Sequence, residues 1–165
     1  MKNLWKKVAL IMSMVLVACS CVACGTPKEQ VFTESDFSIT LNNRFEKQNV
    51  SDVEYMYSAK DAALTVTNMS KQEVKDAGLQ ITSLNRFAIL AMKSYEDGDS
   101  AFVREGLNHS YCEVNSVVDG KNMSYYAAFY ETDTHYWMVL FGCLQENYAD
   151  YQASFANWAS TVTVK

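Results

Sequence analysis

The chain has 165 residues, 49% of them hydrophobic and 20% charged, a balance that fits one globular domain with one core. Its single proline and its 13% aromatic residues argue against long disordered regions. From Cys19 onward, eleven basic residues stand against nineteen acidic ones, a net charge of −8, and this argues against nucleic acid as a partner.

The first eighteen residues are typical of a bacterial export signal. Three lysines within residues 1–7 form a basic head, and Val8 to Ala18 is an apolar run broken only by Ser13. The run is too short for a transmembrane helix, which needs about 20 apolar residues. Extending it to Cys24 gives about 17, so an uncleaved membrane anchor is the alternative.

The apolar run ends in Leu16-Val17-Ala18-Cys19, which resembles the lipobox of bacterial lipoproteins. An aliphatic residue lies three positions before the cysteine, and a small residue lies directly before it. The resemblance implies cleavage before Cys19 and attachment of acyl chains such as palmitate, which would anchor the chain to the outer side of the cell membrane. Residues 1–18 are then the signal peptide, and residues 19–30 are the lipidated end and a polar linker.

A second candidate box is Cys21-Val22-Ala23-Cys24. Cys21 suits the first position less well than Leu16 does, so we favour Cys19 and keep Cys24 as the alternative lipidation site. An acidic domain has no basic patch for anionic lipid headgroups, so the acyl anchor carries the membrane attachment.

Apolar and polar residues alternate in the first part of the domain, which predicts strands over residues 37–41, 53–57 and 63–67. Ser70 and Glu73 have the spacing of a capping box, and Gly78 can end the short helix that follows. A clearer helix begins at Ser83 and is predicted to end at residues 97–99. Its apolar face consists of Leu84, Phe87, Ala88, Ala91, Met92 and Tyr95.

The second part of the domain centres on a hairpin. Residues 123–130 and 136–141 are aromatic, apolar runs that flank a short polar turn, and the second run has no polar residue, which places it in the middle of a sheet. A strand over 111–118 leads into the hairpin through the turn formers Asp119 and Gly120. We also predict a short strand over 101–105, a terminal strand over 161–164, and a helix over 145–159 with Tyr148, Tyr151, Phe155 and Trp158 on one side.

This order predicts an α+β fold, a largely antiparallel β-sheet packed by two main helices. Residues 36–41, 126–130, 136–141 and 155–162 resemble the PsbP/DcrB-like domains of bacterial lipoproteins, and the resemblance covers residues 31–165. It implies a twisted antiparallel sheet between helices, an accessory or assembly role, and no catalytic motif. The sequence leaves the oligomeric state open.

Few residues suggest chemistry. His109 lies three positions before Cys112, and a strand would place the two on opposite faces, so we interpret them as a loop histidine and a core cysteine rather than a nucleophile pair. His135 with Glu131 and Asp133 is interpreted as a solvated turn rather than a metal site. The acidic residues at 96, 97 and 99 lack a full calcium loop.

Cys112 and Cys143 are predicted to be unpaired thiols. With Cys112 opposite roughly Phe129, and Phe129 opposite roughly Trp137, Cys143 would lie roughly 20 Å away along its strand.

These patterns predict a non-enzymatic lipoprotein without cofactor or metal, which binds a protein partner or supports an envelope complex. The alternative is a carrier of a small apolar ligand. Its cavity would be an aromatic sheet face built from Tyr125, Tyr126, Tyr130, Tyr136 and Trp137. An envelope hydrolase is the least supported class, because the sequence shows no recognisable Ser/His/Asp or paired-carboxylate arrangement.

Overall fold

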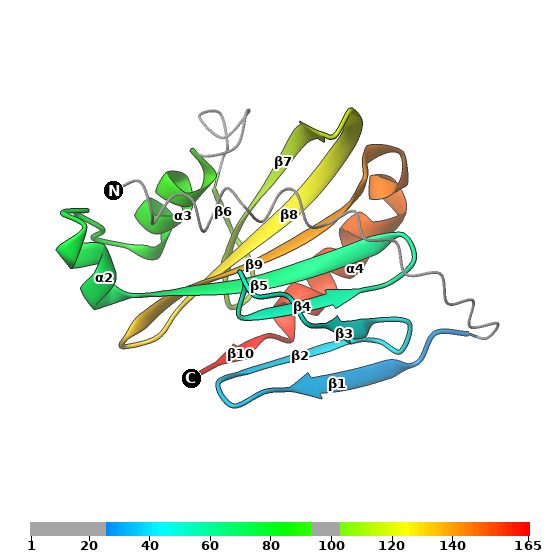
Figure 1. Ribbon diagram of the computed structural model, residues 1–165, viewed down its shortest axis with the longest axis horizontal. Helices are drawn as coiled ribbons and strands as arrows, with labels where there is room; N and C mark the ends of the chain where they lie inside the picture. The colour runs from blue at the N-terminus through cyan, green and yellow to red at the C-terminus, as the bar shows by residue number, and fades with distance from the viewer. Residues whose placement is uncertain (1–25, 94–102) are drawn as a thin grey trace.

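The computed structural model describes residues 26–93 and 103–165, which form two antiparallel sheets and three α-helices (Figure 1). The strands are β1 Glu29–Thr33, β2 Phe37–Asn42, β3 Glu46–Gln48, β4 Tyr55–Ser58, β5 Ala62–Ser70, β6 Arg104–Glu105, β7 Ser110–Val118, β8 Lys121–Glu131, β9 His135–Leu144 and β10 Thr163–Val164. The helices are α2 Lys71–Asp76, α3 Leu84–Met92 and α4 Tyr148–Ser160, the last preceded by the 3-10 turn η3 Gln145–Asn147. The predicted α+β class is confirmed.

β9 lies at the centre of the larger sheet, whose seven strands run in the order β3-β4-β5-β9-β8-β7-β6. It pairs with β5 on one side and with β8 on the other along almost its whole length. Every residue from Tyr136 to Cys143 is buried, which confirms the predicted position of this strand. The turn before β8 has Asp119 and Gly120 at φ 49° and 75°, the left-handed conformations that a two-residue hairpin turn requires.

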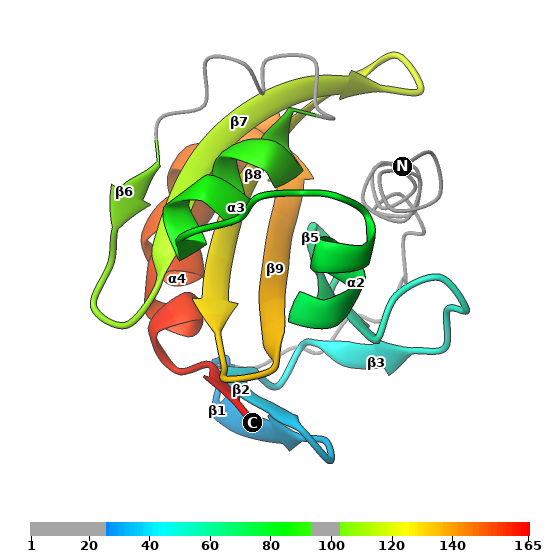
Figure 2. The same ribbon diagram turned by 90° about the vertical axis from the view of Figure 1, so that its left-hand side faces the viewer.

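The larger sheet has two covered faces. Helices α2 and α3 lie against one face, which we call the α3 face, and α4 lies behind the sheet in Figure 2. The other face, the α4 face, is covered by α4 together with the three-stranded sheet β1-β2-β10. Along β9, Met138 and Leu140 point to the α3 face, whereas Trp137, Val139 and Phe141 point to the α4 face. Two continuous cores therefore lie on either side of one sheet.

Several predicted bounds shift by a few residues. The strand expected at Val53 begins at Tyr55, and the helix expected at Gln145 begins as a 3-10 turn and becomes α-helical at Tyr148. α3 ends at Met92, earlier than predicted, and Tyr95 and the predicted stop at 97–99 lie outside the described residues. β1 and β3 have no counterpart among the predicted strands.

Candidate functional site

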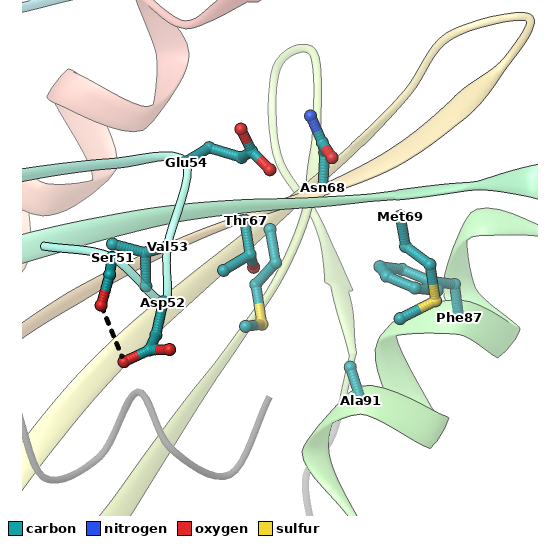
Figure 3. A pocket seen from close by; sticks show the side chains of 10 residues that line it. Ser51, Asp52, Val53, Glu54, Thr67, Asn68, Met69, Phe87 and Ala91 are labelled. Atoms are coloured by element: carbon teal, nitrogen blue, oxygen red, sulfur yellow. Dashed lines mark hydrogen bonds between the residues drawn. The ribbon is translucent and has the colours of Figure 1, made fainter. Parts of the chain in front are cut away.

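A pocket of about 260 Å³ opens beside α3, at the edge of the α3 face (Figure 3). Four segments that are distant in sequence line it. They are the turn at residues 51–54, residues 67–69 of β5, Phe87 and Ala91 of α3, and Met138 of β9.

The floor of the pocket is apolar and fixed in place. Phe87, Ala91 and Met138 are all at least nine-tenths buried. The ring of Phe87 stacks on Tyr136, with ring centroids 4.8 Å apart, and meets the ring of Phe129 edge-on at 6.1 Å. These contacts hold the aromatic ring, so the floor is present before anything binds.

The rim of the pocket is polar and acidic. Ser51 and Asp52 are exposed, and the Ser51 hydroxyl donates to the Asp52 carboxylate at 3.4 Å. In Figure 3, Asp52 lies on the same side of β5 as Phe87 and Ala91, whereas Glu54 projects on the other side. None of the described lining residues is a lysine or an arginine. The pocket therefore combines an apolar floor with the Asp52 carboxylate on the same side of β5, and Glu54 is the second acidic residue of its lining.

His109 lies apart from this pocket, in the loop between β6 and β7. It is only 7% exposed, and it lies among the rings of Tyr111, Tyr126 and Tyr130, with centroids 5.5 to 6.2 Å away. A Cβ atom at Gly106 would come within 2.8 Å of the imidazole, so the ring and the loop backbone are in close contact. The loop position agrees with the interpretation from sequence, but the tyrosine surroundings were not predicted.

The hydrogen bonds of His109 define its tautomer. The Asn108 amide group donates to the Ser160 carbonyl at 3.2 Å, so its oxygen faces Nδ1 of His109 at 2.9 Å. Nδ1 must therefore carry the proton, and Nε2 accepts from the Tyr126 hydroxyl at 3.0 Å. Burial lowers the pKa of His109, which favours this neutral form. The histidine thus connects its loop to β8 and, through Asn108, to the end of α4.

The two described cysteines are free, as predicted, although the assumed register was wrong. Cys112 lies opposite Ala127 rather than Phe129, and Ala127 lies opposite Leu140, only three residues from Cys143. The thiols remain apart because Cys112 belongs to the α3 face and Cys143 to the α4 face. Burial raises the pKa of each thiol to about 12, so both stay protonated and are poor nucleophiles at neutral pH.

The predicted turn at His135 is an ordinary hairpin connection. His135 is partly buried, its Nδ1 lies 2.8 Å from the Thr134 hydroxyl, and Glu131 pairs with Lys71 at 2.7 Å. Within residues 26–93 and 103–165, no three His, Cys, Asp or Glu side chains gather as metal ligands would. The acidic residues at 96, 97 and 99 lie outside the described part of the chain.

The aromatic residues of the central hairpin belong to the core. All five that were predicted as a possible ligand surface are at most 5% exposed: Tyr125, Tyr126, Tyr130, Tyr136 and Trp137. They are divided between the two faces of the sheet, so they do not form one aromatic surface. Two further hollows, of about 520 and 390 Å³, are lined by largely polar residues around the start of α4.

Sequence reasoning missed the pocket beside α3. Asp52 carried no motif, and Phe87 and Ala91 appeared only as the apolar face of a helix. The sequence shows the methionines at positions 69 and 138, and methionine is common at adaptable binding surfaces, but nothing in it places them beside this helix face.

In the described part of the chain, no helix has the length and apolar character needed to cross a membrane. The sequence matches no family model and no curated protein.

The fold is shared with solved structures at low sequence identity. Cyanobacterial PsbP (CyanoP) from Synechocystis sp. PCC 6803 has a TM-score of 0.57 at 13% identity, over 89% of this chain and 98% of that chain. A protein from Bacteroides thetaiotaomicron has a TM-score of 0.56 at 10% identity, over 84% of this chain and 48% of that chain. The Ran-binding protein Mog1p of Saccharomyces cerevisiae has a TM-score of 0.54 at 9% identity, over 84% and 95% of the two chains. These likenesses show that the chain has a PsbP-like fold.

Proposed function

We propose that this chain is a non-enzymatic lipoprotein, anchored through Cys19 on the outer side of a bacterial cell membrane, where it binds a protein partner. The observation that carries the proposal is the Leu16–Cys19 box, because it follows a basic head and a short apolar run. Cys24 is the alternative lipidation site.

Two features support a binding role over a carrier role. The fold is also that of Mog1p, which is named as a Ran-binding protein, so this architecture can serve as a protein-binding module. The pocket beside α3 is small, open at the surface and partly polar, whereas carriers enclose most of an apolar ligand.

Metabolic labelling with an alkyne fatty acid tests the anchor. We expect wild type and Cys24→Ala to be labelled and Cys19→Ala to lose the label. Loss of the label in Cys24→Ala alone would move the anchor to the second box. Labelling that survives both single changes and the double change would end the lipoprotein proposal.

Native mass spectrometry of the detergent-extracted chain separates the two binding roles. A partner-binding protein retains a second polypeptide, which in vivo crosslinking before extraction should trap. A stoichiometric small apolar molecule without any crosslinked polypeptide would favour the carrier instead.

A further inference from the structure

We infer that the pocket beside α3 receives an arginine side chain of a protein partner. This inference rests on the proposed partner-binding role and names the chemistry that the partner presents. Three properties of the pocket lead to it: its size, its floor and its charge.

The volume of about 260 Å³ lies below the roughly 300–1,000 Å³ of pockets that enclose whole drug-sized ligands. A space of this size suits one long side chain inserted from a partner surface. Such anchors carry much of the binding energy of protein interfaces, and arginine is among the residues enriched at them.

The floor suits the stem and the planar head of arginine. Met69 and Met138 present polarisable thioethers, and Met69 packs against the cluster that contains Phe87. The methylene stem of a long basic side chain packs on apolar surface while its charged end stays near water. A guanidinium also stacks on aromatic rings, which a lysine ammonium does less well.

The charge at the mouth selects a cation. Asp52 lies on the side of β5 that carries the apolar floor, and its carboxylate forms no ion pair with another described residue. A neutral apolar side chain would cover this carboxylate without pairing it, whereas a guanidinium would replace the lost water contacts. The net charge of −8 from Cys19 onward attracts a basic partner over longer distances as well.

The test uses the full chain in mild detergent, labelled with ¹³C at the methionine methyl groups and titrated with two model compounds. N-acetyl-arginine amide should shift the NMR signals of Met69 and Met138. N-acetyl-citrulline amide, which has nearly the same shape without the charge, should bind at least about fivefold more weakly. Raising the salt concentration should weaken binding of the arginine compound only.

Asp52→Asn should reduce the affinity for the arginine compound to that for the citrulline compound. Asp150→Asn, at an exposed aspartate of α4, is the matched control and should leave the affinity unchanged. The remaining methionine signals report whether each variant keeps its fold.

Equal shifts from both compounds, an unaffected Asp52→Asn variant, or no shift at either methionine would each overturn the inference. These outcomes are independent of the anchor. A chain that binds the arginine compound but takes up no fatty acid would lose the lipoprotein proposal and keep the pocket assignment.

Discussion

The two faces of the larger sheet hold their helices in different ways. On the α3 face, both helices begin with a side-chain cap. Ser70 and Glu73 form a reciprocal capping box at the start of α2. At the start of α3, the Ser83 hydroxyl accepts a hydrogen bond from the backbone N–H of Arg86 at 3.2 Å. On the α4 face, the N-cap position of α4 is Asn147, whose side chain makes no capping hydrogen bond.

α4 is held by tertiary contacts along its whole length instead. At its start, the Tyr148 hydroxyl donates to Glu113 at 2.5 Å, and near its end the Ala159 carbonyl accepts from the Tyr130 hydroxyl at 2.7 Å. In the middle, Phe155 is fully buried and stacks on Phe141 with ring centroids 5.3 Å apart. The α4 face is therefore a permanent core, whereas the α3 face combines locally specified helices with an open pocket.

The largest expected effect tests the α4 face. Phe155→Ala should lower the free energy of unfolding by about 3–5 kcal/mol, because it removes a buried ring and leaves a cavity against Phe141 and Tyr151. Urea denaturation followed by circular dichroism measures the change. Asn157→Ala, at an exposed position of the same helix, should change stability by less than about 0.5 kcal/mol. A similar small loss for Phe155→Ala would contradict the description of this face as a core.

Tyr126→Phe addresses the polar part of the same face. The change removes the hydroxyl that donates to Nε2 of His109 and leaves a buried acceptor unpaired, at a cost of about 1–3 kcal/mol. The imidazole cannot respond by moving its proton, because the Asn108 oxygen faces Nδ1. Tyr151→Phe is the control, since no hydrogen bond of that hydroxyl with a described residue is present. Equal stability of the two variants would contradict a buried hydrogen bond between Tyr126 and His109.

Ser70→Ala tests the local specification of helices on the α3 face. Loss of the capping box should destabilise the protein by about 1 kcal/mol. Thermal denaturation is sufficient to detect the change, and Lys75→Ala in the exposed last turn of α2 serves as the control. An effect as large as that of Phe155→Ala would mean that α2 depends on more than its local cap.

The smallest effect concerns pH. Because burial lowers the pKa of His109 from its usual 6.5, the unfolded chain takes up a proton before the folded chain does. The contribution of His109 to stability is thus complete above about pH 6.5 and is lost as the pH falls below that value toward the lowered pKa. The titratable side chains in ring contact with His109 are Tyr111, Tyr126 and Tyr130.

Urea midpoints at pH 7.5 and pH 5.2 measure this dependence. Staying above pH 5 keeps Glu34 out of the comparison, since pairing with Lys47 lowers the pKa of that carboxyl from its ordinary 4.5. His109→Gln should flatten the profile between these two pH values. A wild-type midpoint that does not fall on acidification would contradict the neutral, buried histidine.

The sequence predicts those elements of the fold that are determined by neighbouring residues, such as helix caps, tight turns and apolar strands. The strand 136–141, the capping box at Ser70, the helix start at Ser83 and the turn at Asp119-Gly120 are all confirmed, because each depends on neighbouring residues. β3 could not be predicted, since its three residues are all polar and it pairs only at the edge of the sheet. The start of α4 was misplaced because no capping side chain marks it.

The register error shows how small offsets spread. The two-residue turn pairs Val118 with Lys121, which places Cys112 opposite Ala127, two residues from the predicted Phe129.

The pocket beside α3 could not be predicted from the sequence, because its lining depends on the tertiary fold. Its lining comes from four segments, and only the paired strands and α3 bring Asp52 near Phe87 and Met138.

β1 is the first described element, and it pairs only with β2, in the smaller sheet. Tension from the membrane tether that we propose would therefore enter the body at Lys28, which exchanges two hydrogen bonds with Asn43, and would load the β1-β2 ladder first. The five residue pairs of this ladder join β1 to β2, and neither strand pairs with β9. In the lipoprotein that we propose, β1 would therefore separate from β2 before force reached the pocket beside α3.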